Sequence, residues 1–239
     1  RVSDRQSFRV FVSSTFGDLA RERTVLDSLV FPHIADWCAD RGASFRAVDL
    51  RWGISEAASR QRRTMDVCIS EVRRCVAASP SFSLILMLGD RYGWRPLPAR
   101  IDAETFGLLV QASSRDGREL LRASYRLDEN ARPGQYLLQP RDEPGRHAAR
   151  EAEEAVLRSV LDHALAKAFH RDDSRQITYA ASATHLEVAE ALGGSGMGSG
   201  NVLVFARKRD PGKTDEDRRR LDAFEAEMAG RLGRDAIHQ

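Results

Sequence analysis

Short apolar runs alternate with longer stretches of helical periodicity over the first hundred residues of the chain. The runs predict strands near residues 8–13, 45–50 and 82–88. Apolar side chains at helical spacing predict helices between these strands, over residues 18–38 and 64–76. Because a helix separates each strand from the next, we expect the strands to lie parallel in one sheet, with the first between the other two.

The pattern changes at residue 96, and from there to about residue 175 it shows two helical stretches but no convincing strand. It resumes with a helix that begins near Ser182 and a buried strand over residues 202–206. The sequence therefore predicts an α/β domain over residues 1–208, with a parallel sheet flanked by helices and a helical insertion at about residues 96–175.

Composition excludes several classes of protein. The 239 residues carry 37 Lys and Arg against 35 Asp and Glu, a net charge of +2, which is too balanced for a nucleic-acid binder that works by bulk charge. No apolar run approaches the roughly 20 residues that span a membrane, and no secretory signal is recognisable. Cys38, Cys68 and Cys75 lack the spacing of a zinc site. We expect a reduced, cytoplasmic protein with no metal and with no nucleic-acid or membrane partner.

Candidate chemistry lies in the loops that follow the predicted strands, because open parallel sheets bind ligands beyond the carboxyl ends of their strands. The residues of interest there are Ser13, Ser14, Thr15, Phe16, Arg51, Trp52, Arg91, Tyr92 and Trp94. Aromatic rings beside arginines can stack a base or a nicotinamide ring and neutralise phosphate. The alternative is that these loops only cap the sheet and pack their aromatic rings on neighbouring residues.

Glu187 is the candidate catalytic group, on the first turns of the helix that begins near Ser182. A carboxylate at this place can bind a ribose or stabilise positive charge on a sugar carbon. The alternative is an exposed acidic residue that is favoured there only by the helix dipole.

Four long motifs of this chain carry a family resemblance. They are Phe11-Val-Ser-Ser-Thr-Phe-Gly-Asp18, Val48-Asp-Leu-Arg-Trp-Gly-Ile54, Leu88-Gly-Asp-Arg-Tyr-Gly-Trp94 and Ser182-Ala-Thr-His-Leu-Glu187. With Tyr125-Arg-Leu-Asp-Glu-Asn130 and Tyr136-Leu-Leu-Gln-Pro140, they resemble the TIR-like N-terminal domain of STAND proteins of the NACHT/WD-repeat, nephrocystin-like and telomerase-associated kinds. The resemblance covers nearly the whole chain, and we expect a bacterial member of the group.

The resemblance implies a flavodoxin-like fold and two alternative functions. Some TIR-type domains cleave NAD at the nicotinamide–ribose bond with a glutamate in the pattern Ser-x-Trp-Cys-x-x-Glu, and others only assemble with like domains. Ser182 and Glu187 occupy the corresponding positions here, although the Trp and the Cys of the pattern are absent. Residues 209–239 resemble a connector helix that leads into an NTPase module.

These implications define an enzyme hypothesis and a rival. The enzyme would bind no cofactor tightly and would hydrolyse NAD or NADP when a C-terminal NTPase module clusters the domains. Trp52, Tyr92 or Trp94 would stack the nicotinamide, and Arg51 or Arg91 would hold the pyrophosphate. The rival is a non-catalytic module for homotypic protein–protein interaction. Open space between Glu187 and the loop after the first strand would favour the enzyme, and a filled cleft would favour the module.

Overall fold

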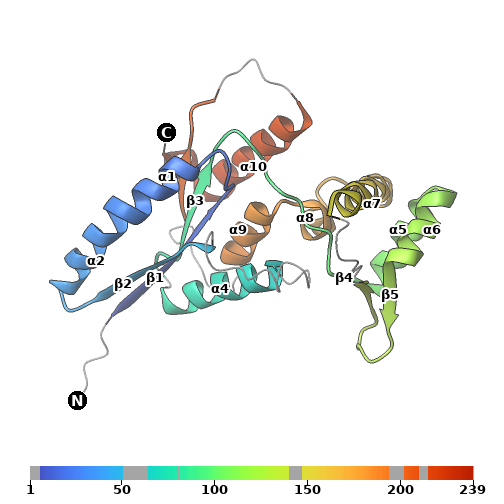
Figure 1. The fold of residues 1–239 in the computed structure, drawn as a ribbon, viewed down its shortest axis with the longest axis horizontal. Helices are drawn as coiled ribbons and strands as arrows, with labels where there is room; N and C mark the ends of the chain where they lie inside the picture. The colour runs from blue at the N-terminus through green and yellow to red at the C-terminus, as the bar shows by residue number, and fades with distance from the viewer. Residues whose placement is uncertain are drawn as a thin grey trace. The chain divides into compact units, whose positions relative to one another are not determined.

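The computed structural model describes residues 6–50, 64–79, 81–139, 147–193, 202–209 and 215–238 (Figure 1). The described residues form two compact units. The first, which we call the α/β unit, holds the described residues of 6–50 and 64–94, and those from Ser182 onward. The second, the inserted unit, runs from Arg95 to Ala181.

A parallel sheet forms the centre of the α/β unit. Its strands are β1 (Ser7–Ser14), β2 (Ser44–Val48), β3 (Leu84–Leu88), β7 (Val202–Ala206) and β8 (Ile237–His238). They lie in the order β2-β1-β3-β7-β8, and every neighbouring pair is parallel. The four predicted strands and the central position of the first are thus confirmed, and β8 was not predicted. Among strands of this sheet taken in chain order, the order is 2-1-3-4-5, which is that of a flavodoxin-like fold.

Helices cover both faces of this sheet (Figure 1). One face packs against α1 (Ala20–Val25), the π-helical turn η1 (Leu26–Val30) and α2 (Phe31–Ala39). The other packs against α4 (Thr64–Ala78), α9 (Ala183–Gly193) and α10 (Glu216–Leu232). A short 3-10 turn, η4 (Arg234–Ala236), leads into β8. None of the helices in the described ranges is long and apolar enough to cross a membrane.

Strand periodicity assigns each residue of β1 to one of these faces. Val10 and Val12 point into the core beneath α1 and α2, whereas Phe11 points into the core beneath α4, α9 and α10. The same alternation continues to the end of the strand. It directs Ser13 towards α9 and Ser14 towards α1, as their hydrogen bonds show.

The final helix α10 belongs to the core of the α/β unit. Leu221, Phe224 and Met228 are buried against the sheet side that α4 and α9 also cover. α10 therefore contributes to the stability of this unit. The role of residues 209–239 as a connector to a further module stays a prediction.

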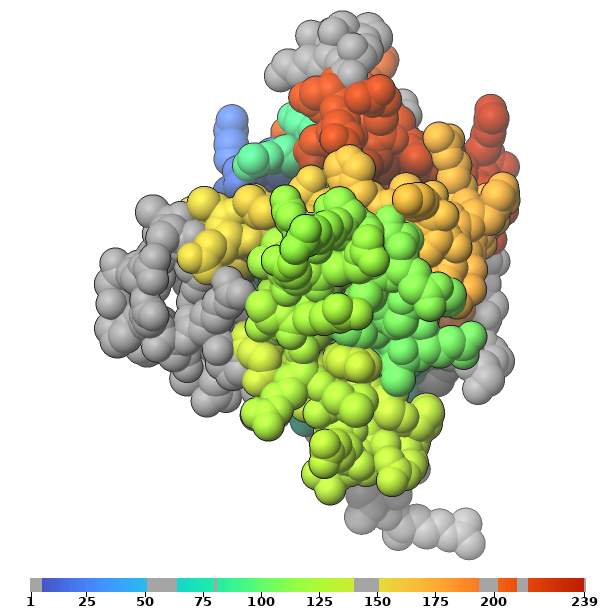
Figure 2. Space-filling model, turned by 90° about the vertical axis from the view of Figure 1, so that its right-hand side faces the viewer, coloured from blue at the N-terminus to red at the C-terminus, as the bar shows by residue number. Residues whose placement is uncertain are grey.

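The inserted unit is mainly helical, as expected, but it also contains three short strands that were not predicted. Its elements are β4 (Arg100–Asp102), α5 (Ala103–Ala112), α6 (Arg115–Ser124), β5 (Tyr125–Asp128), β6 (Gln135–Leu138), α7 (His147–Ala168) and α8 (Ser174–Ala180). The strands form an antiparallel sheet in the order β4-β6-β5. Figure 2 looks onto the surface that residues between 95 and 140 form, in green.

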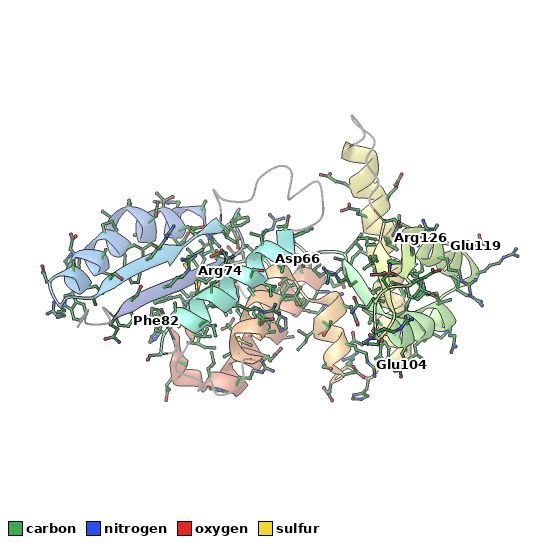
Figure 3. All side chains as sticks on the ribbon, turned by 90° about the horizontal axis from the view of Figure 1, so that it is seen from below. Asp66, Arg74, Phe82, Glu104, Glu119 and Arg126 are labelled. Carbon is green, nitrogen blue, oxygen red and sulfur yellow. The ribbon has the colours of Figure 1, made fainter. Side chains whose placement is uncertain are left out.

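The inserted unit has its own core, in which the sheet packs against α5 and α7. Phe106 stacks on Tyr136 with the ring centres 3.9 Å apart, and Leu161 and Leu165 of α7 are fully buried. Charged side chains such as Glu119 and Arg126 project from its surface (Figure 3).

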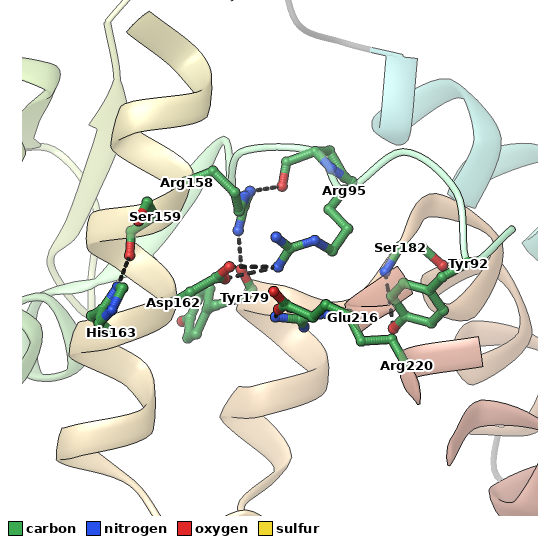
Figure 4. Close-up of polar contacts among 11 residues, drawn as sticks. Tyr92, Arg95, Arg158, Ser159, Asp162, His163, Tyr179, Ser182, Glu216 and Arg220 are labelled. Atoms are coloured by element: carbon green, nitrogen blue, oxygen red, sulfur yellow. Dashed lines mark hydrogen bonds and ion pairs between the residues drawn. The ribbon is translucent and has the colours of Figure 1, made fainter. Parts of the chain in front are cut away.

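A buried arginine ties α7 to two other segments of the inserted unit. Arg158 donates hydrogen bonds to the carbonyl oxygens of Tyr179, at 2.8 Å, and of Pro96 (Figure 4). Close by in the chain, Arg95 binds both carboxylate oxygens of Asp162, at 2.9 and 2.7 Å. These contacts fix the first and last segments of the unit to its longest helix.

Candidate functional site

A cavity of about 1060 Å³ lies at the carboxyl edge of the parallel sheet in the α/β unit. It is bordered by the loops after β1 and β3, two adjacent strands whose connections leave the sheet in opposite directions, which is where such folds bind ligands. The described residues that contribute polar or aromatic groups to its wall include Ser14, Thr15, Phe16, Asp18, Arg23, Cys68, Asp90, Arg91, Trp94, Thr184, Glu187, Asp215, Asp217 and Arg218.

Glu187 is part of this wall and is itself buried. Its side chain is 7% exposed, and its Oε2 accepts a hydrogen bond of 2.5 Å from the Ser13 hydroxyl at the end of β1. The thiol of Cys68, which comes from α4, is a second hydrogen-bond partner of the same carboxylate. The alternative of an exposed acidic residue on the helix surface is therefore wrong, because α9 turns this residue towards β1 and α4.

Burial controls the electrostatics of Glu187. Removal from water raises its pKa to about 7, and the hydrogen bonds from Ser13 and Cys68 and the positive charge of Arg23 oppose this rise only in part. The carboxyl group therefore exchanges its proton near neutral pH, which is the range in which an acid–base or charge-stabilising group is most useful. Burial also raises the pKa of the Cys68 thiol, so this sulfur stays protonated and donates.

Asp18 fastens the two cavity loops to each other. Its Oδ2 accepts hydrogen bonds from the backbone N–H groups of Asp90 and Arg91, at 2.6 and 3.2 Å, and its Oδ1 accepts one from the Thr15 hydroxyl. The approach is close enough to require glycine in the β3 loop, since a Cβ on Gly89 would lie 2.3 Å from Asp18 Oδ2. The loops thus form one preorganised rim.

This rim presents two aromatic side chains and an arginine. Phe16 and Trp94 both line the cavity and are 52% and 57% exposed. Arg91 is exposed as well, and its guanidinium forms no ion pair with any residue that the structure describes. The rim therefore offers stacking surfaces and a cation at the mouth of the cavity.

Tyr92 and Ser182 have structural positions instead. The Tyr92 ring is buried against Phe224, and its hydroxyl lies 3.0 Å from His185 Nδ1 and accepts a hydrogen bond from the Ser182 N–H (Figure 4). The Ser182 hydroxyl accepts from the backbone N–H of His185, as a helix N-cap does. Neither side chain lines the cavity, so together they fix the start of α9, from which Glu187 projects.

The structure thus brings part of the sequence-derived set together. Ser14, Thr15, Phe16, Arg91, Trp94 and Glu187 share one cavity, and Ser13 joins it through Glu187. Arg51 and Trp52 lie outside the described residues. Within the described ranges, no group of three or more His, Cys, Asp or Glu residues is placed to hold a metal ion.

Several residues of the wall were missed by sequence reasoning. Among them, Arg23 and Cys68 come from helices and not from the loops after strands. A signal was present for each, because both occupy helix positions on the apolar face, Arg23 four residues after Leu19 and Cys68 four before Val72. An arginine on an apolar helix face is a sign of a buried charge with partners.

The α/β unit is therefore a flavodoxin-like α/β domain with a preformed cavity at the switch point of its sheet. Residues 9–107 match a family described as "Domain of unknown function (DUF4062)". That match begins in β1 and continues through the loop after β3 into α5, so it includes both loops that form the rim. None of the solved structures matches the chain significantly.

Curated relatives include large proteins with NACHT domains and WD repeats. The chain is 31% identical over 191 residues to NACHT domain- and WD repeat-containing protein 1 of Mus musculus, a match that covers 78% of this chain and 12% of the relative. It is 31% identical over 139 residues to NACHT and WD repeat domain-containing protein 2 of the same species, which covers 57% of this chain and 8% of the relative.

A further curated relative is named for telomerase and not for NACHT domains or WD repeats. The chain is 37% identical over 91 residues to Telomerase protein component 1 of Rattus norvegicus, covering 38% of this chain and 3% of that protein. In each of these matches the chain spans 12% or less of the relative's length. The similarity is to one segment of these much longer proteins.

Proposed function

We propose that the α/β unit is a TIR-like effector domain that hydrolyses NAD or NADP at the nicotinamide–ribose bond. The observation that carries this proposal is Glu187, a buried carboxylate in the wall of a cavity of about 1060 Å³ at the carboxyl edge of the sheet. Ser13 contacts one carboxylate oxygen, but Thr15 and Phe16 of the loop after β1 line the same cavity as Glu187. Open space between Glu187 and this loop is the arrangement we expect of the enzyme.

The proposed reaction breaks the bond between C1′ of the ribose and the nicotinamide nitrogen. Nicotinamide leaves with the electron pair and becomes neutral, water attacks C1′, and one proton is released with ADP-ribose, or with ADP-ribose 2′-phosphate when the substrate is NADP. Positive charge develops on the ribose in the transition state. In a site of low dielectric constant, an ionised Glu187 would stabilise that charge more strongly than it could in water.

The residues of the rim have matching roles in this proposal. Trp94 and Phe16 are the described aromatic residues that line the cavity and are exposed enough to stack the nicotinamide or the adenine. Arg91 would bind the pyrophosphate, because its guanidinium is not already neutralised by a described carboxylate. Tyr92 is excluded from stacking by its place in the core.

The relatives support a context for this activity. Proteins whose names include NACHT domains and WD repeats share this segment, so we place the domain N-terminal to an NTPase module in a STAND-type protein. Assembly of that module would bring copies of the domain together and activate them. Self-association is therefore part of the proposal.

The test is nicotinamide release by the 239-residue chain, free at high concentration and displayed in many copies on a multivalent scaffold. NAD and NADP are offered separately, and Glu187→Gln is the matched control because it keeps the size of the side chain. Release by the clustered wild type that is lost in the variant would support the enzyme. Absence of release from either nucleotide in both formats would overturn it.

The second candidate is a non-catalytic homotypic interaction module. It is favoured by Val25, Leu29 and Trp37, which are 49%, 67% and 52% exposed along the helical segment from α1 to α2. For this candidate, a charge introduction such as Leu29→Glu should abolish self-association measured by sedimentation. Self-association together with a chain that never releases nicotinamide would select this function.

A further inference from the structure

Arg23 is the most deeply buried charged side chain of the cavity wall, at 2% exposed. Its Nε donates to the Ser14 hydroxyl at 2.6 Å, and its Nη2 donates to the carbonyl oxygens of Ser14 and Val12 at 3.0 and 3.4 Å. Its Nη1 donates to Asp49 at 2.5 Å. The planar guanidinium thus binds the backbone at the carboxyl end of β1 and connects it, through Asp49, to the segment that follows β2.

Burial of a charged guanidinium costs free energy of folding, so its presence here indicates that its fixed position is important. A buried charge loses its hydration, and for buried ion pairs in general this cost can exceed the gain from pairing. Arg23 pairs with Asp49, which is itself largely buried. An apolar residue on this face of α1 would fill the space without that cost. The proposed chemistry at Glu187 makes no direct use of Arg23, so the guanidinium has no role there as a ligand for the substrate.

A short path of contacts leads from Arg23 to Glu187. Arg23 fixes both the hydroxyl and the carbonyl group of Ser14. Ser13 is the preceding residue of the same strand, and since its side chain points to the opposite face, the conformation of Ser14 also sets the direction of the Ser13 hydroxyl. That hydroxyl is the 2.5 Å donor to Glu187.

We propose that Arg23 is a positioning residue for Glu187, whose guanidinium holds the end of β1 so that Ser13 is aimed at the carboxylate, with Asp49 holding the guanidinium in place. The inference rests on the proposed function for the catalytic use of Glu187, but the geometry that it describes is independent of turnover. The Arg23–Asp49 ion pair also has an electrostatic effect, because the negative charge of Asp49 limits the positive potential that Arg23 adds to the cavity.

Among the described elements packed around Glu187, two titratable groups influence its charge, namely Cys68 from α4 and Arg23 from α1. Ser13 from β1 is a neutral hydrogen-bond donor. The positive charge of Arg23 lowers the pKa of Glu187, against the larger effect of burial. Changes to Arg23 and to Asp49 should therefore move the titration of Glu187 in opposite directions.

The experiment is a carbon-13 NMR titration of the Glu187 carboxyl group in the 239-residue chain, assigned by the loss of its signal in Glu187→Gln. Arg23→Met keeps much of the side-chain length but removes the charge and the donors, and should raise the midpoint by roughly half a pH unit or more. Asp49→Asn removes the negative charge that pairs with Arg23 Nη1 and should lower the midpoint. Arg23→Lys keeps the charge and should stay closer to the wild type than Arg23→Met.

Arg9→Met is the matched control. Arg9 also lies on β1 and is paired with a glutamate, Glu71, but it does not act on Glu187. It should leave the midpoint unchanged. If Arg23→Met fails to fold, the proposal is tested by the direction in which Asp49→Asn moves the midpoint of the Glu187 titration.

Midpoints that stay at the wild-type value in every folded variant of Arg23 and Asp49 would overturn the positioning role and leave a purely structural clamp. This outcome is distinct from failure of the proposed function, since the titration needs no substrate. If the chain does release nicotinamide, its pH profile should move with the NMR midpoint in each variant. A profile that does not follow the midpoint would also contradict the proposal.

Discussion

Two carboxylates, one in each unit, respond to burial in opposite ways. Glu187 in the α/β unit has its pKa raised to about 7, because burial outweighs its hydrogen bonds and the charge of Arg23. Asp102 in the inserted unit is also subject to burial, but hydrogen bonds from Thr105 and Tyr179 outweigh that effect and lower its pKa. The difference lies in the donors that surround each group.

The difference separates two uses of an acidic residue. Asp102 is the N-cap of α5 and also accepts a 2.8 Å hydrogen bond from the Tyr179 hydroxyl, so its negative charge stabilises the fold. Glu187 makes the fold less stable when it ionises, and it lies in the wall of a cavity. A group kept at such a cost is a candidate for function, and this contrast between the two carboxylates can be tested.

The largest expected effect is on the pH dependence of stability. The pKa of Glu187 is about 7 in the folded chain against 4.5 as its ordinary value, so between these pH values the folded state holds a proton that the unfolded state has lost. The stabilisation is complete below pH 4.5 and is lost as the pH rises through 7. Between about pH 5 and about pH 8 the wild type should lose up to roughly 3 kcal/mol more than Glu187→Gln. Chemical denaturation at both pH values measures this, and parallel pH profiles would contradict it.

Glycine-to-alanine substitutions, one in each unit, should change the free energy of unfolding in opposite directions. Gly89→Ala would place its Cβ 2.3 Å from Asp18 Oδ2 and should destabilise the chain by about 1–3 kcal/mol, because the two cavity loops must separate. Gly107 lies within α5 of the inserted unit, and no described atom outside its own helix turn lies within 4 Å of the place that an added methyl group would take. Gly107→Ala should therefore stabilise the chain by about 0.5–1 kcal/mol. Unfolding free energies of both variants at one pH measure the difference. Equal effects would argue against a tightly fastened rim.

Asp102→Ala tests the structural half of the comparison. It removes the cap of α5 and the partner of the Tyr179 hydroxyl, and should cost about 1–2 kcal/mol at neutral pH. Because the pKa of Asp102 is lowered in the folded chain, its contribution is present above its ordinary pKa of 3.8 and is lost as the pH falls below that value. The deficit of the variant should therefore shrink under acid conditions. A deficit that does not depend on pH would contradict an ionised cap.

How much of the fold could be predicted depended on the length of its strands. The buried run from Leu84 to Leu88 is apolar throughout and defined its strand without ambiguity. The strands of the inserted unit are three or four residues long, and Arg100 and Arg126 are exposed on them. Such segments bury too few side chains for a pattern of period two to stand out.

The candidate site was predictable where it depends on strand ends and not where it depends on helix packing. Ser14, Phe16, Arg91 and Trp94 follow strands or end them, so the topology of the sheet alone places them at one edge. The burial of Glu187 depends on how α9 is rotated against β1 and α4, which a local pattern does not specify. For the same reason Tyr92, which follows β3 as closely as Trp94 does, could not be assigned to the core in advance.

The most direct test of the account measures nicotinamide release and unfolding free energy together, in the clustered wild type, Glu187→Gln and Asp102→Ala. We expect Glu187→Gln to lose about a hundredfold or more of the release rate while its stability at about pH 8 equals or exceeds that of the wild type. Asp102→Ala should lose stability and keep release within about threefold, which shows that a loss of stability of about 1–2 kcal/mol does not itself abolish turnover. Undiminished release in Glu187→Gln would contradict the central claim, that the buried carboxylate of the α/β unit is its catalytic group.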